Sequence, residues 1–245
     1  MKNVAMVTGA GQGIGKAIAK ELASRGYKVA ACDINEETGN ATALELTESG
    51  NTSKFYKTNV TSLESLSKTV ADVENELGPI DVLVNTVGWD IIQNFMDNSV
   101  EYWEKVIDLN FRSVVYGCKA VLPNMVERKY GRIINIASDA GRAGSSGETV
   151  YAGAKGGVIA FTKSLAREMA RHKVIVNCVC PGPTDTPLFA SQPDKMKEAL
   201  IRAIPLRRLA QPENIAYAVG FFAEERAEFM TGQVLSVSGG LTMVD

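Results

Sequence analysis

The amino-acid sequence predicts a single α/β domain over residues 1–245, built on a doubly wound parallel sheet flanked by helices. Short apolar runs alternate with helical patterns along the chain, and the first run leads into a glycine-rich turn. Several runs are apolar on successive residues, as in Val82-Leu83-Val84, which is typical of parallel strands covered on both faces. Such alternation implies right-handed crossovers, so ligands are expected beyond the carboxyl ends of the strands.

Each predicted element follows from a local change of pattern. Short runs rich in β-branched residues predict strands, and longer segments with apolar residues three or four positions apart predict helices. The expected helices lie near 13–25, 36–49, 62–77, 101–128, 150–171 and 212–223. The expected strands are Val4–Thr8, Lys28–Asp33, Lys54–Thr58, Asp81–Asn85, Gly131–Ala137, Val174–Val179 and Gln233–Val237.

Composition limits the classes of function. The 26 basic and 28 acidic residues form no basic run, so a small-molecule substrate is expected rather than nucleic acid or a membrane. No apolar segment approaches the roughly 18 residues of a membrane-spanning helix, and no export signal is expected, which predicts a cytoplasmic protein with free, buried cysteines. The single histidine, His172, makes a histidine-based hydrolase or zinc site improbable, so no metal is expected.

The segment Thr8–Gly15 joins the first predicted strand to the first predicted helix. It reads T-G-x-x-x-G-x-G, and its glycines would let the backbone turn tightly against a pyrophosphate. The helix that follows offers free N–H groups and a favourable dipole to the same group. A glycine cluster alone also fits an ordinary turn, but a strand before it and a helix after it favour a dinucleotide site.

Asp33 closes the second predicted strand, 18 residues after Gly15. A carboxylate at this position can accept hydrogen bonds from ribose hydroxyls and would repel a 2′-phosphate. No lysine or arginine lies between Val29 and Glu37, so NAD is expected rather than NADP. The alternative is an acidic cap on the next helix.

Tyr151 and Lys155 are spaced to lie one turn apart on the same face of a helix. A free tyrosine has a pKa of roughly 10, and a nearby cation favours the phenolate and lowers that pKa. Ser138, at the end of the fifth predicted strand, would hydrogen-bond the same substrate oxygen. Together these residues predict an oxidoreductase that interconverts a secondary alcohol and a ketone by hydride transfer.

The chain resembles the short-chain dehydrogenase/reductase family over essentially its whole length. The resemblance implies a Rossmann-type fold, a homotetramer and four catalytic residues. Tyr151 would be the acid/base, Lys155 would bind the nicotinamide ribose and lower the tyrosine pKa, and Ser138 would orient the substrate. Asn110 would interrupt its helix and hold a water of the proton relay. The residues that carry the resemblance are Thr8, Gly9, Gly13, Ile14, Gly15, Asn85, Gly88, Asn110, Ser138, Tyr151, Lys155, Pro181, Gly182 and Thr186.

The resemblance also implies the residues that would hold the cofactor, with Thr184 and Thr186 meeting the nicotinamide amide. Two positions depart from the family pattern: Thr86-Val87 replaces Asn-Ala, for which a modest local shift is expected, and Asn59 replaces an aspartate beside adenine. The expected cofactor-binding residues are Gly9, Gln12, Gly13, Ile14, Gly15, Asp33, Asn59, Val60, Asn85, Gly88, Tyr151, Lys155, Pro181, Gly182, Thr184 and Thr186.

The substrate is expected under a lid formed by the proline-rich stretch 183–211, which breaks the strand–helix alternation. Trp89 either walls the pocket or packs on the adjacent loop. The basic residues of the lid either meet a phosphate-bearing carrier or form a solvated face. The stretch 137–148 resembles family members that act on hydroxyacyl-CoA thioesters. A 3-oxoacyl carrier-protein reductase is the alternative, although biosynthetic reductases usually use NADPH, and a non-catalytic NAD-binding or partner subunit is the alternative of another class.

Overall fold

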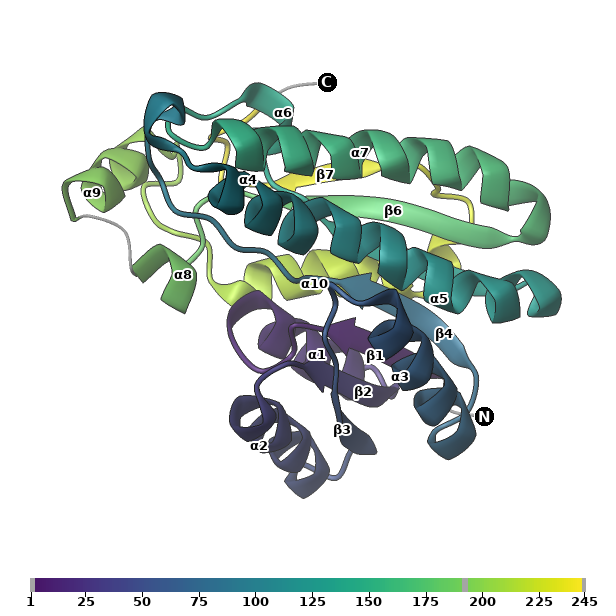
Figure 1. Cartoon of the computed structure of the whole chain (residues 1–245). Helices are drawn as coiled ribbons and strands as arrows, with labels where there is room; N and C mark the ends of the chain where they lie inside the picture. Colours follow the sequence, from purple (N-terminus) through teal and green to yellow (C-terminus); the bar gives the residue numbers. More distant parts are fainter. Residues whose placement is uncertain (1–2, 191–193, 244–245) are drawn as a thin grey trace.

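The computed structural model describes residues 3–190 and 194–243, and in them one sheet organises the chain. Its strands run all parallel in the order β3-β2-β1-β4-β5-β6-β7 (Figure 1). The predicted fold class, a single Rossmann-type α/β domain, is therefore confirmed, and every predicted strand is present with small changes at its ends. The strands are β1 (Val4–Thr8), β2 (Lys28–Asp33), β3 (Ser53–Lys57), β4 (Ile80–Asn85), β5 (Gly131–Ile136), β6 (Val174–Pro181) and β7 (Val234–Val237).

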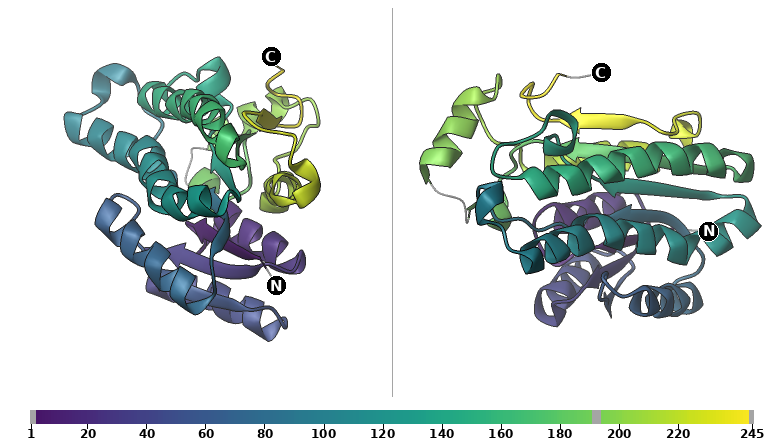
Figure 2. Two further views of the ribbon diagram at one scale, coloured as in Figure 1. Left: turned by 90° about the vertical axis from the view of Figure 1, so that its right-hand side faces the viewer. Right: turned by 45° about the horizontal axis from the view of Figure 1, so that its top comes forward.

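Helices cover both faces of the sheet, and the left view of Figure 2 shows them as two layers on opposite sides of it. The α-helices are α1 (Gly13–Ser24), α2 (Glu36–Glu48), α3 (Leu63–Glu76), α4 (Val100–Ile107), α5 (Ser113–Arg128), α6 (Ala140–Ala143), α7 (Thr149–Met169), α8 (Pro187–Ala190), α9 (Asp194–Ala203) and α10 (Pro212–Ala223). Short 3₁₀ turns lie at Phe95–Asp97, Ala170–His172 and Glu225–Ala227.

Two apolar cores lie between the sheet and its helix layers. Along β1, Val4 and Met6 pack with α3, α5 and α7, whereas Ala5 and Val7 pack with α1, α2 and α10. Successive side chains of a strand point to opposite faces, so a strand buried on both faces must be apolar throughout. All four cysteines are buried and free, as expected from the sequence. The described residues contain no helix that is both long enough and apolar enough to span a membrane.

The strand order reverses between β1 and β4, because β2 and β3 lie on one side of β1 and the later strands on the other. The turns that leave the carboxyl ends of β1 and β4 therefore diverge and open a crevice between them. Thr86 joins the two strand ends: its N–H donates to Thr8 Oγ1 at 3.1 Å, and its hydroxyl donates to the Thr8 carbonyl. This crevice is where the predicted cofactor residues meet.

The long helix expected near 101–128 is divided by a π-helical turn at Asp108–Arg112, between α4 and α5. Asn110 lies in this turn and is fully buried. Its Nδ2 donates to the carbonyls of Val106 at 2.9 Å and Trp89 at 2.7 Å, so the side chain takes part in the helix hydrogen bonding and also holds a distant loop. An extra residue in the turn is the usual form of such an interruption.

Candidate active site

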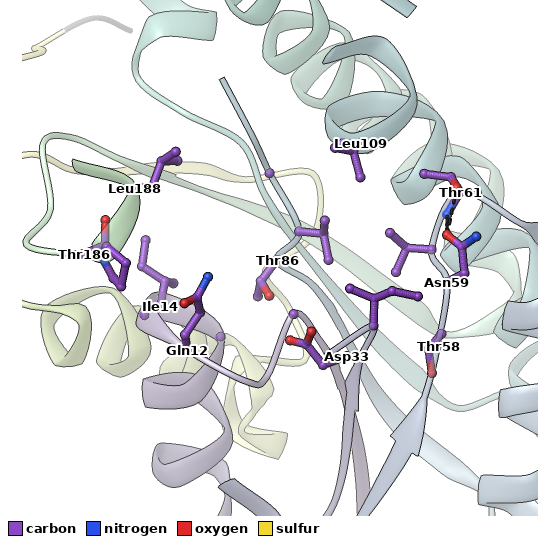
Figure 3. Close-up of a pocket in the computed structure, with 18 residues that line it drawn as sticks. Gln12, Ile14, Asp33, Thr58, Asn59, Thr61, Thr86, Leu109, Thr186 and Leu188 are labelled. Carbon is purple, nitrogen blue, oxygen red and sulfur yellow. Dashed lines mark hydrogen bonds between the residues drawn. The ribbon is translucent and has the colours of Figure 1, made fainter. Parts of the chain in front are cut away.

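Two adjoining cavities open at the carboxyl ends of the strands, with volumes of about 380 Å³ and 480 Å³. The first is lined by the glycine turn, Asp33, the segment after β3 and the segment after β4 (Figure 3). The second is lined by residues after β5 and β6, by α7 and by the C-terminal segment. The cavities adjoin, since they share Ile14, Thr86, Gly88, Thr186 and Leu188.

The glycine turn has the geometry that a pyrophosphate site requires. Gly9 and Gly13 have φ values of +67° and +51°, in the left-handed region that favours glycine. A Cβ at Gly15 would lie 2.0 Å from the Gly9 carbonyl oxygen, so only glycine permits this contact between turn and helix. The first turn of α1 has no side-chain cap, which leaves its N–H groups to a ligand. These residues therefore fit the pyrophosphate of a nicotinamide dinucleotide.

Asp33 lies in the wall of the first cavity at the end of β2 (Figure 3). Its Oδ2 accepts the Gly11 N–H at 2.8 Å, and its Oδ1 accepts the Asn35 N–H at 3.0 Å. The N-cap of α2 is Asn35, whose side chain accepts the Thr38 N–H, so the alternative of Asp33 as a helix cap is wrong. A carboxylate oxygen has further acceptor capacity, which leaves Asp33 able to bind ribose hydroxyls.

The segment after β3 forms the end of the first cavity, where the adenine was expected. Val60 lines it, as predicted, together with Thr58, Asn59 and Thr61. Asn59 Oδ1 accepts both the N–H of Thr61 at 3.0 Å and its hydroxyl at 2.8 Å. Because a carbonyl oxygen has two lone pairs, Asn59 must turn before it can accept from adenine. Its contact with the cofactor remains a prediction.

Of the residues expected after β4, the structure brings Gly88 into both cavities but not Asn85. The Asn85 side chain is buried and donates to Asn135 Oδ1 on β5 at 2.9 Å. It therefore connects two strands beneath the site. Thr86, one of the two departures from the family pattern, lines both cavities and packs on the glycine turn.

Ser138, Tyr151 and Lys155 line the second cavity together. Lys155 is buried, its Nζ donates to the Ile136 carbonyl at 2.9 Å, and it lies 5.7 Å from the centre of the Tyr151 ring. The close approach of α6 to α7 maintains this arrangement, since a Cβ at Gly141 would lie 2.6 Å from the Lys155 carbonyl carbon. The structure therefore places a hydroxyl, a phenol and an ammonium in one cavity wall.

The pKa of Tyr151 differs from the sequence-based expectation of a lowered value. Burial of the phenol raises the pKa above its usual range, and the carboxylates of Glu148 and Asp90 raise it further. A hydrogen bond with Ser138 opposes these effects. The physical reason is that burial penalises the phenolate more than its hydrogen bond to Ser138 stabilises it. Burial therefore favours the protonated phenol of Tyr151.

Burial lowers the pKa of Lys155 to about 8, since the ammonium is removed from water. The folded-state pKa lies below the unfolded value of 10.5, so the unfolded chain binds more protons between pH 8 and pH 10.5. The cost of burying the charge is therefore fully present below pH 8 and decreases as the pH rises towards 10.5.

We expect Lys155→Met to increase the stability of the folded protein at pH 7 while it abolishes activity. The gain should be about 1–3 kcal/mol, because an apolar chain of similar length removes a buried charge, less the loss of one hydrogen bond. This gain in stability should decrease above pH 8. Urea denaturation at several pH values measures the gain, with Lys163→Met on the exposed face of α7 as control. A lower stability of Lys155→Met at pH 7 would contradict the prediction.

The loop after β4 is held by Asn110, whose Oδ1 accepts the Trp89 N–H at 3.2 Å. Trp89 itself packs on Tyr102, with ring centres 5.9 Å apart, and the Lys105 ammonium lies 3.7 Å from its ring centre. Trp89 lines neither cavity, so the second alternative, packing on the adjacent loop, is the correct one. The role of Asn110 in a proton relay remains a prediction.

The segment after β6 supplies the wall between the cavities. Pro181, Gly182 and Thr184 line the second cavity, and Thr186 lines both. The Thr184 hydroxyl donates to the Gly182 carbonyl at 2.9 Å, which orders this turn. Leu241 and Thr242 also line the second cavity. Sequence reasoning missed these two, because no local pattern marks a C-terminal segment that returns to the site.

Apolar residues of the predicted lid line the second cavity, among them Leu188, Phe189 and Leu200. Residues 191–193 of that stretch lie outside the described residues. The basic side chains described in the stretch, at Lys197, Arg202, Arg207 and Arg208, line neither of the two large cavities, which favours the solvated-face alternative. The side chain of Lys195 is not among those described.

The apolar stripe of α7 faces the core, with Val158 and Leu165 buried in it. Phe161 packs at its edge against Phe111, with ring centres 6.3 Å apart. The apolar side of α7 is therefore part of the core.

Comparison with known proteins gives full-length matches. A family model described as Enoyl-(Acyl carrier protein) reductase matches residues 9–242. The 3-oxoacyl-(acyl-carrier-protein) reductase of Vibrio cholerae is 40% identical over 241 residues, which cover 98% of each chain. The enzymes of the same name from Chlamydia muridarum and Escherichia coli are 39% and 38% identical over 242 and 241 residues, again covering 98% of each chain.

Proposed function

Because the chain belongs to the short-chain dehydrogenase/reductase family, it is an oxidoreductase of the ketone-reducing type, and we propose that it uses NAD(H) to interconvert a 3-oxoacyl and a 3-hydroxyacyl thioester. One observation carries the proposal. A cavity lined by Ser138, Tyr151 and Lys155 adjoins a second cavity lined by the glycine turn and Asp33. A dinucleotide that extends along both would present its nicotinamide to a substrate oxygen at Tyr151.

We assign the proton chemistry to Tyr151. When bound, the cofactor supplies or accepts the hydride. In reduction, the Tyr151 phenol donates a proton to the oxygen that becomes the alcohol, and Ser138 holds the same oxygen by a hydrogen bond. Lys155 supplies a positive charge beside the phenol, and its pKa of about 8 keeps it mainly protonated at neutral pH. Because burial raises the pKa of Tyr151, the site is suited to reduction near neutral pH, and oxidation should become faster as the pH rises.

The choice of NAD(H) is supported by the charges of the first cavity. Asp33 is the charged residue among the described residues that line it, and no lysine or arginine accompanies it. A 2′-phosphate would place two further negative charges beside this carboxylate. The non-catalytic alternative is disfavoured by the three catalytic side chains that share one cavity and by relatives that are all named as reductases.

The thioester substrate is supported by the second cavity and by the relatives. The lining combines Ser138 and Tyr151 with Ile92, Leu188 and Phe189, and so suits an acyl chain with one carbonyl at the hydroxyl pair. The relatives are named for oxoacyl groups held on an acyl-carrier protein, so that carrier is the second candidate. We place coenzyme A first because Asp33 favours NAD(H) over the NADPH usual in biosynthesis.

The test follows NADH absorbance with acetoacetyl-CoA, acetoacetyl carrier protein and butanone. We expect kcat/KM for a thioester to exceed that for butanone by about 100-fold, because binding energy from the rest of the substrate lowers the barrier. The larger of the two thioester values identifies the carrier. NADH binding without reduction of either thioester would overturn the proposal.

We further propose that the protein is a cytoplasmic homotetramer. Four free, buried cysteines fit a reducing compartment. Exposed apolar side chains near the C-terminal end of the chain, at Tyr217, Phe221, Phe229, Met230 and Leu235, suit contact with other copies.

A further inference from the structure

The wall of the second cavity contains a carboxyl group that the proposed proton chemistry does not use. Asp90 lies on the loop after β4 and is only 6% exposed. It lines the cavity together with Ser138 and Tyr151. A charged side chain this deeply buried is unusual unless its oxygens are paired.

Asp90 is held by hydrogen bonds from the Tyr102 hydroxyl and the Ile91 backbone. The Tyr102 hydroxyl donates to Oδ1 and holds the carboxyl in place. Oδ2 is buried, and no hydrogen-bond donor reaches it from the part of the chain that the structure describes. A native protein rarely leaves a buried carboxylate oxygen unsatisfied without a functional reason.

Glu148, which also lines the cavity, brings a second carboxyl group near Asp90. The two loops that carry them are joined, since the Gln93 N–H donates to the Gly147 carbonyl at 3.0 Å. A Cβ at Gly147 would lie 2.8 Å from Ile92 Cγ2, which shows how closely the loops pack. Burial and the neighbouring Glu148 raise the pKa of Asp90 to about 6, as expected for two carboxyl groups held together.

The charges around the cavity are unbalanced. Among the described lining residues, Asp90, Asp139 and Glu148 are acidic, and Lys155 is basic. Asp139 Oδ2 accepts the Ser236 hydroxyl at 2.6 Å, whereas its Oδ1 also has no donor. An anion that enters this cavity meets carboxylates with no cation other than the lysine beside Tyr151.

We propose that Asp90, paired with Glu148, is a specificity-determining residue that admits oxoacyl groups without charge and rejects those that end in a free carboxylate. The inference rests on the proposed function, since it concerns which 3-oxoacyl compounds reach Ser138 and Tyr151. A thioester or ester presents an uncharged carbonyl to the acidic wall. The corresponding free acid presents a third negative charge in a poorly hydrated space, and like-charge contacts of this kind discriminate strongly.

The test compares ethyl acetoacetate with acetoacetate as substrates of the full-length protein and NADH. For the wild type we expect kcat/KM for the ester to exceed that for the acid by about 100-fold. Asp90→Asn should lower the ratio of kcat/KM for the ester to kcat/KM for the acid about tenfold. The asparagine oxygen can still accept from Tyr102, so the loop should be preserved. Glu148→Gln, at a less buried position, should act in the same direction.

Asp97→Asn is the matched control, since Asp97 lies on the same connection but is exposed and lines neither of the two large cavities. An ester-to-acid ratio within twofold of the wild-type value in both Asp90→Asn and Glu148→Gln would overturn the inference. A wild-type protein that reduced acetoacetate and ethyl acetoacetate equally well would also overturn the inference. Ethyl acetoacetate and acetoacetate contain no carrier, so this test does not depend on the thioester proposal. If the thioester proposal fails, the thioesters are reduced poorly, but the ester-to-acid ratio still changes in Asp90→Asn.

Discussion

Replacing Tyr151 with phenylalanine is expected to lower kcat for ketone reduction by about three orders of magnitude. The substitution removes only the phenol oxygen, so the aromatic ring is retained in the cavity wall. Without that oxygen, the Ser138 hydroxyl is left at the substrate oxygen, and it is too weak an acid to protonate the developing alkoxide.

The measurement is kcat from NADH absorbance, together with the dissociation constant for NADH from its fluorescence. We expect the dissociation constant to change less than about threefold, because most of the proposed cofactor contacts lie in the first cavity. Tyr130→Phe, directly before β5 and outside both large cavities, is the control and should retain wild-type kcat. A Tyr151→Phe protein that keeps more than a tenth of the wild-type kcat would require another proton donor.

Asp33 is expected to determine the preference of the protein for NADH over NADPH. We expect the wild type to prefer NADH over NADPH by about 100-fold in kcat/KM, because a 2′-phosphate beside a carboxylate is repelled. Asp33→Ser should remove most of that preference. Adding Ile34→Arg, at a residue that lines the same cavity and is 61% exposed, should reverse it, since a guanidinium binds phosphate with two hydrogen bonds.

Initial rates with both cofactors at several concentrations measure the preference. Glu37→Gln is the control, because Glu37 is an exposed carboxylate on α2 that lies outside the first cavity. Equal kcat/KM for NADH and NADPH in the wild type would contradict the assignment of NAD(H). An unchanged preference in Asp33→Ser would show that another feature of the cavity excludes the phosphate.

The features predicted correctly from the sequence depend on residues close together in the chain. A strand that ends in a glycine turn before a helix, and a tyrosine one turn before a lysine, are local arrangements that backbone geometry determines almost alone. The all-parallel sheet followed because alternating strands and helices leave few alternative topologies. For the same reason Gly13, Asp33, Ser138 and Tyr151 all lie at the carboxyl ends of the strands, where they were expected.

Tertiary contacts determine the side-chain orientations and pKa values that local sequence patterns do not predict. The Asn85 side chain points into the core because its amide hydrogen-bonds Asn135, 50 residues away. The Trp89 side chain points away from the cavity because it packs on Tyr102 and Lys105. The pKa of Tyr151 is raised because burial, which the sequence does not specify, outweighs its hydrogen bond with Ser138. The sequence alone identified the residues to which we assign the chemistry. The packing of distant segments determined which side chains face the cavity and how strongly each holds its proton, since both depend on removal from water and on neighbours far along the chain.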